Sequence, residues 1–226
     1  MENLKPNEKR AKNAIILIWI MLAFDIISFI SGYFQYNLLQ SAANGVEISI
    51  ETANANDLRE QIIGITNLIV FFISAITFIL WFRRAYYNLH LKLSFLSYRE
   101  EWAVYAWFIP FISLYRPHQI MKELYHETKR YLTKKGLGLD LTLSSHILGL
   151  WWALWIINNF VGQFILRYSL KAETLDQIST VTIASMIGNV IGIPLSLITI
   201  KVIRDYSKME QYLCKAEDIE AIGTTE

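Results

Sequence analysis

The sequence predicts an all-α fold, a polytopic membrane helical bundle with four spans. The 226-residue chain is 54% apolar and 18% charged, whereas soluble domains average about 45–50% apolar and about 25% charged residues. Four stretches hold roughly the 20 apolar residues that a bilayer core of about 30 Å requires. All 21 Lys and Arg lie outside them, and Asp25 is the only acidic residue inside. This partition is expected because burying a charge in hydrocarbon is costly.

The predicted spans cover about 14–34, 62–82, 147–166 and 178–200. They form a single transmembrane domain over 14–200, between an N-terminus of residues 1–13 and a C-terminal tail of residues 201–226. The first span could instead be a signal peptide, because four basic residues precede it. Its apolar run is longer than the roughly 7–15 residues of a signal-peptide core, so we expect it to be a retained span.

The basic residues predict the orientation. Four precede the first span, ten lie between the second and third, and four follow the last, against one and two in the other two loops. Loops rich in Lys and Arg stay on the cytoplasmic side. We therefore expect both termini, and the connection between the second and third spans, to be cytoplasmic.

Residues 102–115 form an uncharged segment of fourteen residues within that connection. As a helix the segment would reach about 21 Å, too short to span a bilayer, and a crossing there would erase the charge asymmetry. The segment is therefore expected to be re-entrant or interfacial, with Trp102 and Trp107 at headgroup depth. Pro110 lacks a backbone donor and should break any helix.

Residues 116–135 have an amphipathic pattern, with Ile120, Leu124 and Leu132 set against basic residues such as Lys122 and Lys129. The pattern predicts a cytoplasmic surface helix that ends at Gly136. Its basic face would lie on anionic lipid headgroups; the alternative is a docking surface for a protein partner.

Four polar residues within the predicted spans are candidate site residues, namely Asp25, Asn158, Asn159 and Asn189. Asp25 shares a helical stripe with Ser28, Gly32 and Gln35. It could relay protons or cations, or hydrogen-bond to a neighbouring helix. Asn189 belongs to a seam of small and polar residues along the fourth span, which predicts close helix packing. Trp151 and Trp152, near the cytoplasmic end of the third span, indicate an aromatic anchor or one wall of a pocket.

Several classes of function have no support in the sequence. The single cysteine, Cys214, excludes an intrachain disulfide or a cysteine-based metal site. Glu123 and His126 match half of a di-iron pattern, and no second copy exists. Phosphate-loop and hydrolase motifs are absent, and a net charge of +1 argues against nucleic-acid binding. We expect no catalytic residue, no metal and no cofactor.

Several motifs occur in a specific order, namely Trp102-Ala103-Val104, Trp107-Phe108-Ile109-Pro110, Arg116-Pro117, Glu123-Leu124 and Gly149-Leu150-Trp151-Trp152-Ala153-Leu154-Trp155. This order resembles the bacterial membrane family catalogued as domain of unknown function 4328, over about residues 62–209. Arg99-Glu100-Glu101 stands where the family usually has Ser-Pro. The resemblance implies a multi-pass protein of the bacterial cell (inner) membrane and no established activity. It draws attention to Arg116, which could pair with Glu123 or with a lipid phosphate.

Three functions follow as hypotheses. The first is a non-enzymatic scaffold or accessory subunit that binds lipid or a protein partner at its cytoplasmic face and that could form homo-oligomers. Its candidate residues are Trp102, Trp107, Pro110, Arg116, Pro117, Glu123, Trp151 and Trp152. The second is a small oligomeric transporter or channel subunit with a midplane cavity around the four intramembrane polar residues. The third is a lipid-acting enzyme that uses Arg116, His118, Glu123 and His126.

Overall fold

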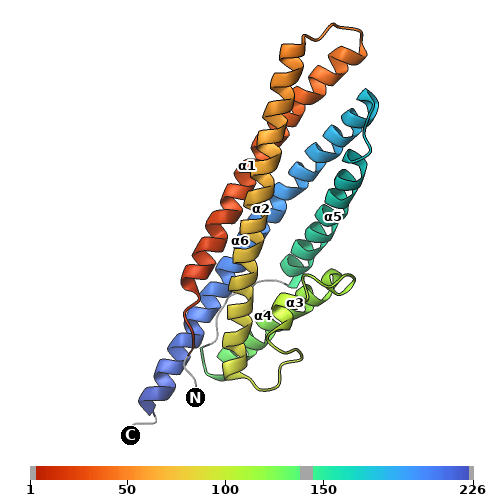
Figure 1. Ribbon diagram of the computed structural model, residues 1–226. Coiled ribbons are helices and arrows are strands. Elements are labelled where there is room, and N and C mark those ends of the chain that lie inside the picture. Colours follow the sequence, from red (N-terminus) through yellow and green to blue (C-terminus); the bar gives the residue numbers. More distant parts are fainter. Residues whose placement is uncertain (1–3, 138–144, 224–226) are drawn as a thin grey trace. The chain divides into compact units, whose positions relative to one another are not determined.

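A computed structural model describes residues 4–137 and 145–223, except the side chains of Ser145 and of residues 216–223 (Figure 1). Residues 1–3 and 224–226 of the predicted termini lie outside the described residues. Every regular element in the described ranges is helical, which confirms the all-α fold. The elements are α1 (Glu8–Ala43), α2 (Ile50–Lys92), α3 (Trp102–Tyr105), the 3-10 helix η1 (Ile112–Leu114), α4 (Arg116–Lys134), α5 (Ser145–Ser169) and α6 (Leu175–Gly223).

Four of the helices, α1, α2, α5 and α6, are long and apolar enough to cross a membrane. They contain the four predicted spans, so this part of the prediction is confirmed. Three of them are much longer than the apolar stretch within them; α2, for example, runs over Ile50–Lys92, whereas its predicted span covers 62–82. The backbone hydrogen bonds of a helix do not depend on the polarity of the side chains, so these helices continue beyond their apolar stretches.

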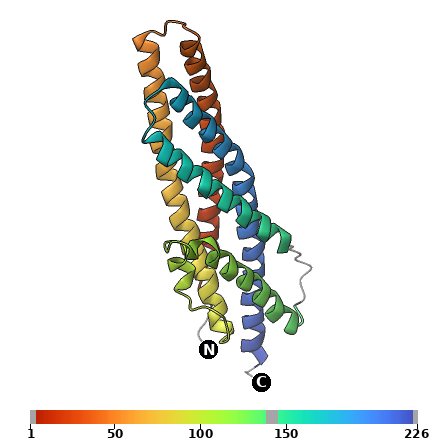
Figure 2. The ribbon, with the colours of Figure 1, turned by 90° about the vertical axis from the view of Figure 1, so that its right-hand side faces the viewer.

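The described chain divides into two compact units. Unit 1 comprises Met1–Ile16, Ser74–Trp152 and Thr199–Glu226, and unit 2 comprises Leu17–Ile73 and Ala153–Ile198. Each long helix contributes one segment to each unit. Unit 1 also contains α3, η1 and α4, which lie beside the ends of α2 and α6 (Figure 2).

Unit 1 has an aromatic core. Trp81, Trp151 and Tyr206 are among its largest fully buried side chains. The ring centroids of Trp81 and Tyr206 are 6.1 Å apart, and those of Phe78 and Trp151 are 6.2 Å apart. Such ring pairs each contribute about 0.5–1.5 kcal/mol beyond the burial of their surface.

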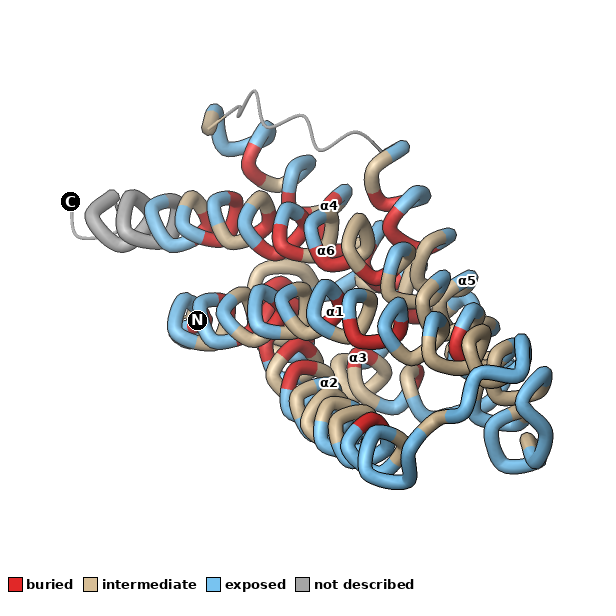
Figure 3. The backbone as a smooth tube through the Cα atoms, turned by 90° about the horizontal axis from the view of Figure 1, so that it is seen from above, coloured by how far each residue is buried: buried red, intermediate tan, exposed pale blue. Residues whose placement is uncertain are grey.

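Helix α4 confirms the amphipathic pattern, and its apolar face is covered by protein. The buried residues (red in Figure 3) are Pro117, Ile120, Met121, Leu124, Tyr125, Thr128 and Leu132. The Tyr125 hydroxyl donates a hydrogen bond to the carbonyl oxygen of Val202 on α6. Gly136, with φ +73°, follows the end of the helix as predicted. The apolar face of α4 therefore packs against the rest of unit 1, and its basic face remains exposed.

Residues 102–115 contain no helix long enough to cross a bilayer. The helix α3 has four residues, η1 has three, and turns connect them. Pro110 lies in one of these turns, as expected of a residue that breaks helices, although α3 already ends at Tyr105. On its inner side the segment is held by Trp152, whose Nε1 donates a hydrogen bond of 2.9 Å to the carbonyl oxygen of Leu114.

In unit 2, glycines allow the helices to approach closely. A methyl group placed on Gly32 of α1 would lie 3.0 Å from the Cγ of Met186 on α6. One on Gly188 would lie 3.4 Å from Val161 of α5, and one on Gly192 would lie 2.6 Å from a carboxylate oxygen of Asp25 on α1. Gly188 and Gly192, four residues apart on α6, therefore face different neighbours, which agrees with the close helix packing expected along the fourth span.

Candidate functional site

The segment from α3 to η1, residues 102–115, is hereafter called the knuckle. Its outer side carries apolar side chains with unusually large exposure. Phe111 is 81% exposed and Phe108 is 70% exposed. The other exposed apolar residues of the knuckle are Tyr105, Ile109, Leu114 and Tyr115. A concentration of exposed apolar residues within one short segment is typical of a surface that contacts another molecule or a membrane.

The backbone at Phe111 is strained. Its φ and ψ are 64° and −43°, a combination that side chains with a Cβ rarely adopt. The amide of Ile112 donates a hydrogen bond of 2.7 Å to the carbonyl oxygen of Pro110. The three residues thus form a γ-turn with positive φ, which is rare and strained. Strain of this kind persists only where the surrounding structure enforces it.

The inner side of the knuckle packs against two of the predicted spans. The ring centroid of Trp107 is 5.6 Å from that of Phe78 and 6.1 Å from that of Trp152. Phe78 belongs to the second predicted span and Trp152 to the third. Trp151 and Trp152 are themselves buried in the core of unit 1, so the structure places them behind the knuckle.

Arg116 and Glu123 do not form an ion pair, which was one of the two alternatives for Arg116. The Arg116 guanidinium lies 4.3 Å from the ring centroid of Tyr98, and the rings of Trp102 and Tyr115 are each 5.5 Å away. The Glu123 carboxylate accepts hydrogen bonds of 2.7 Å from the Tyr86 hydroxyl and from the amide of Ser97. Seven residues separate the two along the helix, a rise of about 10 Å, and each side chain has nearer partners.

His118 follows Pro117, the buried proline of the first turn of α4, and its ring stacks on that of Trp152 at 5.6 Å. Burial, and then the nearby Lys122 ammonium, lower the pKa of His118. Its Nε2 atom is buried and has no hydrogen-bond partner among the described residues. His126 is exposed, and Glu123 is bonded to Tyr86. The polar residues proposed for a lipid-acting enzyme thus have separate environments.

Sequence reasoning missed a buried polar cluster in unit 1. The Glu210 carboxylate on α6 is 7% exposed and accepts hydrogen bonds from the Nδ2 atoms of Asn88 at 2.7 Å and Asn7 at 3.0 Å. Asn88 also bonds to both backbone groups of Lys5, at 3.1 and 2.9 Å. The cluster fastens the residues before α1 to α2 and α6. Each of its hydrogen bonds joins residues more than eighty positions apart, so no local sequence pattern reveals the cluster.

The four intramembrane polar residues have different environments within unit 2. Asp25 is buried against Gly192 and makes no hydrogen bond with any described residue, so the expected bond to a neighbouring helix is not formed. Asn159 donates to the carbonyl oxygen of Trp155 in its own helix. Asn158 and Asn189 are half-buried. No hydrogen bond joins any two of the four in the described part of the chain.

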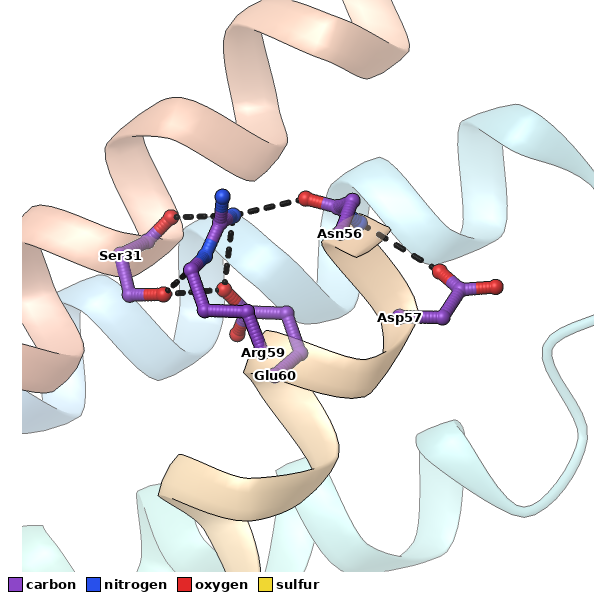
Figure 4. Close-up of polar contacts among 5 residues, drawn as sticks. All are labelled: Ser31, Asn56, Asp57, Arg59 and Glu60. Carbon is purple, nitrogen blue, oxygen red and sulfur yellow. Dashed lines mark hydrogen bonds and ion pairs between the residues drawn. The ribbon is translucent and has the colours of Figure 1, made fainter. Parts of the chain in front are cut away.

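A second polar cluster, also missed, joins α1 to α2 in unit 2 (Figure 4). The Arg59 Nε donates to the Ser31 hydroxyl at 2.8 Å, and its Nη2 donates to the Asn56 side-chain carbonyl at 2.7 Å. Glu60 accepts from the Ser31 hydroxyl at 2.5 Å and pairs with Arg59 at 3.2 Å. Arg59 is the only basic residue between Lys12 and Arg83, a signal that could have drawn attention to it.

No group of three or more His, Cys, Asp or Glu residues within the described ranges is arranged to hold a metal ion. The model of one protein family, described as "Domain of unknown function (DUF4328)", matches residues 44–208. No curated protein and no solved structure matches the chain.

Proposed function

Since the chain belongs to the DUF4328 family, we propose that it is a non-enzymatic multi-pass protein of the bacterial inner membrane, a scaffold or accessory subunit whose knuckle inserts into the cytoplasmic leaflet. The proposal depends mainly on the exposed apolar side of the knuckle. Phe108 and Phe111 are exposed, while the opposite side of the same segment packs on residues of two candidate spans.

Hydrocarbon contact would stabilise this arrangement. Transfer of a phenylalanine side chain from water into an apolar environment contributes roughly 1.5–3 kcal/mol. The contact of Trp107 with Phe78, which lies inside the second predicted span, favours a position of the knuckle near the hydrocarbon boundary. A segment that dips into one leaflet and returns satisfies its backbone through turns and protein contacts, as required at that depth.

The basic residues of α4 also favour contact with the cytoplasmic leaflet. The exposed basic residues of this helix and of its C-cap are Lys122, Lys129, Arg130, Lys134 and Lys135. Each basic residue near an anionic membrane surface contributes about 1 kcal/mol of attraction. The knuckle and α4 are contiguous in the chain, so apolar insertion and attraction to headgroups would act together.

The non-enzymatic part of the proposal is supported by the separate environments of His118, Glu123 and His126. The transport alternative requires a shared polar cavity around Asp25, Asn158, Asn159 and Asn189. It receives no support from hydrogen bonds, since none links these residues within the described chain.

Fluorescence quenching tests the insertion. In a Cys214→Ser background, an environment-sensitive label is attached to Phe108→Cys or Phe111→Cys, with Lys134→Cys as the water-facing control. We expect brominated acyl chains in reconstituted vesicles to quench the two knuckle labels and iodide to quench the control. Equal iodide quenching at all three positions would contradict insertion. Protection of the knuckle labels from both quenchers would instead indicate a protein partner or a second copy.

Orientation is tested separately. Single cysteines at Arg99, Lys134 and Glu47, which is exposed in the loop between α1 and α2, are treated with a membrane-impermeant maleimide in intact cells and in inverted vesicles. We expect Arg99 and Lys134 to react on the cytoplasmic side and Glu47 on the opposite side. Reaction of Arg99 and Lys134 from different sides would overturn the proposed threading.

A further inference from the structure

A cleft in unit 2 has no part in the proposed function. It lies between the ends of α1 and α2 nearest their connecting loop and has a volume of about 400 Å³. Its lining residues are Phe34, Leu38, Glu51, Thr52, Ala55, Asn56 and Arg59. The cleft therefore combines a guanidinium, a carboxylate and an apolar wall.

The guanidinium of Arg59 is fixed in position. Its Nε and Nη2 atoms donate to Ser31, Asn56 and Glu60, and the side chain is only 38% exposed. The remaining nitrogen, Nη1, carries no dashed line in Figure 4 and makes no hydrogen bond with a described residue. A guanidinium held in this way presents N–H donors to an anionic oxygen with little loss of side-chain entropy.

Glu51 supplies the opposite charge. It lies in the first turn of α2, is exposed, and forms no ion pair with any residue that the structure describes. A simple anion bound to Arg59 would be repelled by Glu51 and Glu60, and a simple cation bound to Glu51 would be repelled by Arg59. A ligand with both charges can satisfy the two ends of the cleft.

The predicted spans place the apolar wall of the cleft at the bilayer depth where the lipid acyl chains begin. Phe34 is 56% exposed and is the last residue of the first predicted span. Arg59 precedes the second predicted span by three residues, a rise of about 4.5 Å, which corresponds to the headgroup layer of a bilayer. The exposed residues Ile30 and Ile62 continue the apolar surface along the two helices.

We propose that this cleft binds the phosphoethanolamine headgroup of a membrane phospholipid. A phosphate oxygen accepts hydrogen bonds from Nη1 of Arg59, the primary ammonium pairs with Glu51, and the acyl chains run along Phe34. The two charged contacts distinguish this headgroup from phosphoglycerol, which lacks the ammonium.

The test measures binding of short-chain lipids to the full-length protein in mild detergent. The probes are dihexanoyl phosphatidylethanolamine, dihexanoyl phosphatidylglycerol and glycerophosphoethanolamine, which has the headgroup without acyl chains. We expect the first to bind most tightly. Glu51→Gln should weaken its binding about tenfold, the effect of losing one charge-assisted contact. The same variant should not weaken binding of the phosphatidylglycerol probe, because it removes a charge that repels the anionic headgroup.

Two further variants keep the test independent of folding. Arg59→Gln removes several hydrogen bonds between α1 and α2 and can destabilise the hairpin, so Ala55→Leu is used to fill the cleft while Arg59 and Glu51 are retained. Arg167→Gln removes a basic residue that does not line the cleft and is the matched control. Ala55→Leu should abolish binding of the ethanolamine lipid, and Arg167→Gln should not affect it.

Equal binding of the two lipids, or binding unaffected by both Glu51→Gln and Ala55→Leu, would overturn the proposal. If glycerophosphoethanolamine binds as tightly as the lipid and responds to the same variants, the lipid assignment is wrong and the site takes a water-soluble phosphoethanolamine ester. The cleft belongs to unit 2 and the knuckle to unit 1, so either proposal can fail without the other.

Discussion

The Nδ2 atom of Asn88 donates a hydrogen bond of 2.7 Å to Oε1 of Glu210, whose side chain is buried in unit 1. The two residues lie on α2 and α6, and the same asparagine also holds the backbone of Lys5. A buried carboxylate depends strongly on such donors because it has lost its water. This contact therefore couples two long helices to the segment that precedes α1.

Replacement of Asn88 by leucine should destabilise the protein. The variant leaves Glu210 with Asn7 as its remaining donor, and a hydrogen bond to a charged group contributes about 1.5–3 kcal/mol. We expect the free energy of unfolding in detergent to fall by about that amount, as measured by denaturant titration. Asn54→Ala, at an exposed position of the same helix, is the control and should change stability little. Equal stability of both variants would show that the cluster is dispensable.

Alanine at position 192 should disturb the contact between α6 and Asp25. The added methyl group would lie 2.6 Å from a carboxylate oxygen of Asp25, so one of the two must move. Overpacking of this kind costs about 1–3 kcal/mol. The measurement is a double-mutant cycle of thermal stability with Asp25→Ala.

In that cycle, the cost of Gly192→Ala should largely disappear when Asp25 is already alanine. Gly188→Ala is a milder companion, because its methyl group would meet Val161 at 3.4 Å. Strict additivity of the Gly192 and Asp25 changes would contradict the contact.

His118 should make the protein less stable at mildly acidic pH. Burial lowers the pKa of His118 in the folded state, so below its ordinary value of about 6.5 the unfolded chain binds more protons than the folded one. The free energy of unfolding should therefore decrease as the pH falls through that value. His118→Phe keeps a ring against Trp152 without a titrating group, and its advantage over the wild type should appear only on the acidic side. A stability difference that is the same at every pH would refute this effect.

Glycine at position 111 should relieve the backbone strain of the knuckle. A residue with a Cβ in such a conformation costs of order 1–3 kcal/mol, and glycine loses about 0.5–1 kcal/mol of that gain through the entropy of the unfolded chain. We expect Phe111→Gly to be more stable than Phe111→Ala by about 1 kcal/mol in detergent. Phe108→Gly, compared with Phe108→Ala, controls for the glycine itself. A gain of similar size at Phe108 would assign the effect to something other than the positive φ.

Local patterns were sufficient for much of the architecture. The four membrane-length helices, the amphipathic α4 ending before Gly136, and the absence of a long helix around Pro110 all followed from composition and spacing. These features depend on short-range causes, namely the insolubility of charge in hydrocarbon, helical periodicity and the missing amide of proline.

Pairs of distant residues required the folded chain. Of the two partners considered for Arg116, Glu123 is not the one it contacts, because Tyr86, Ser97 and three aromatic rings lie nearer to the two charges. The bonds of Asn88 to Glu210 and of Arg59 to Ser31 join separate helices. The type of an apolar or amide residue does not specify whether a lipid tail or another helix covers its side chain. The rotation and depth of each helix against its neighbours therefore determine which polar groups meet, and that information belongs to packing over the whole chain.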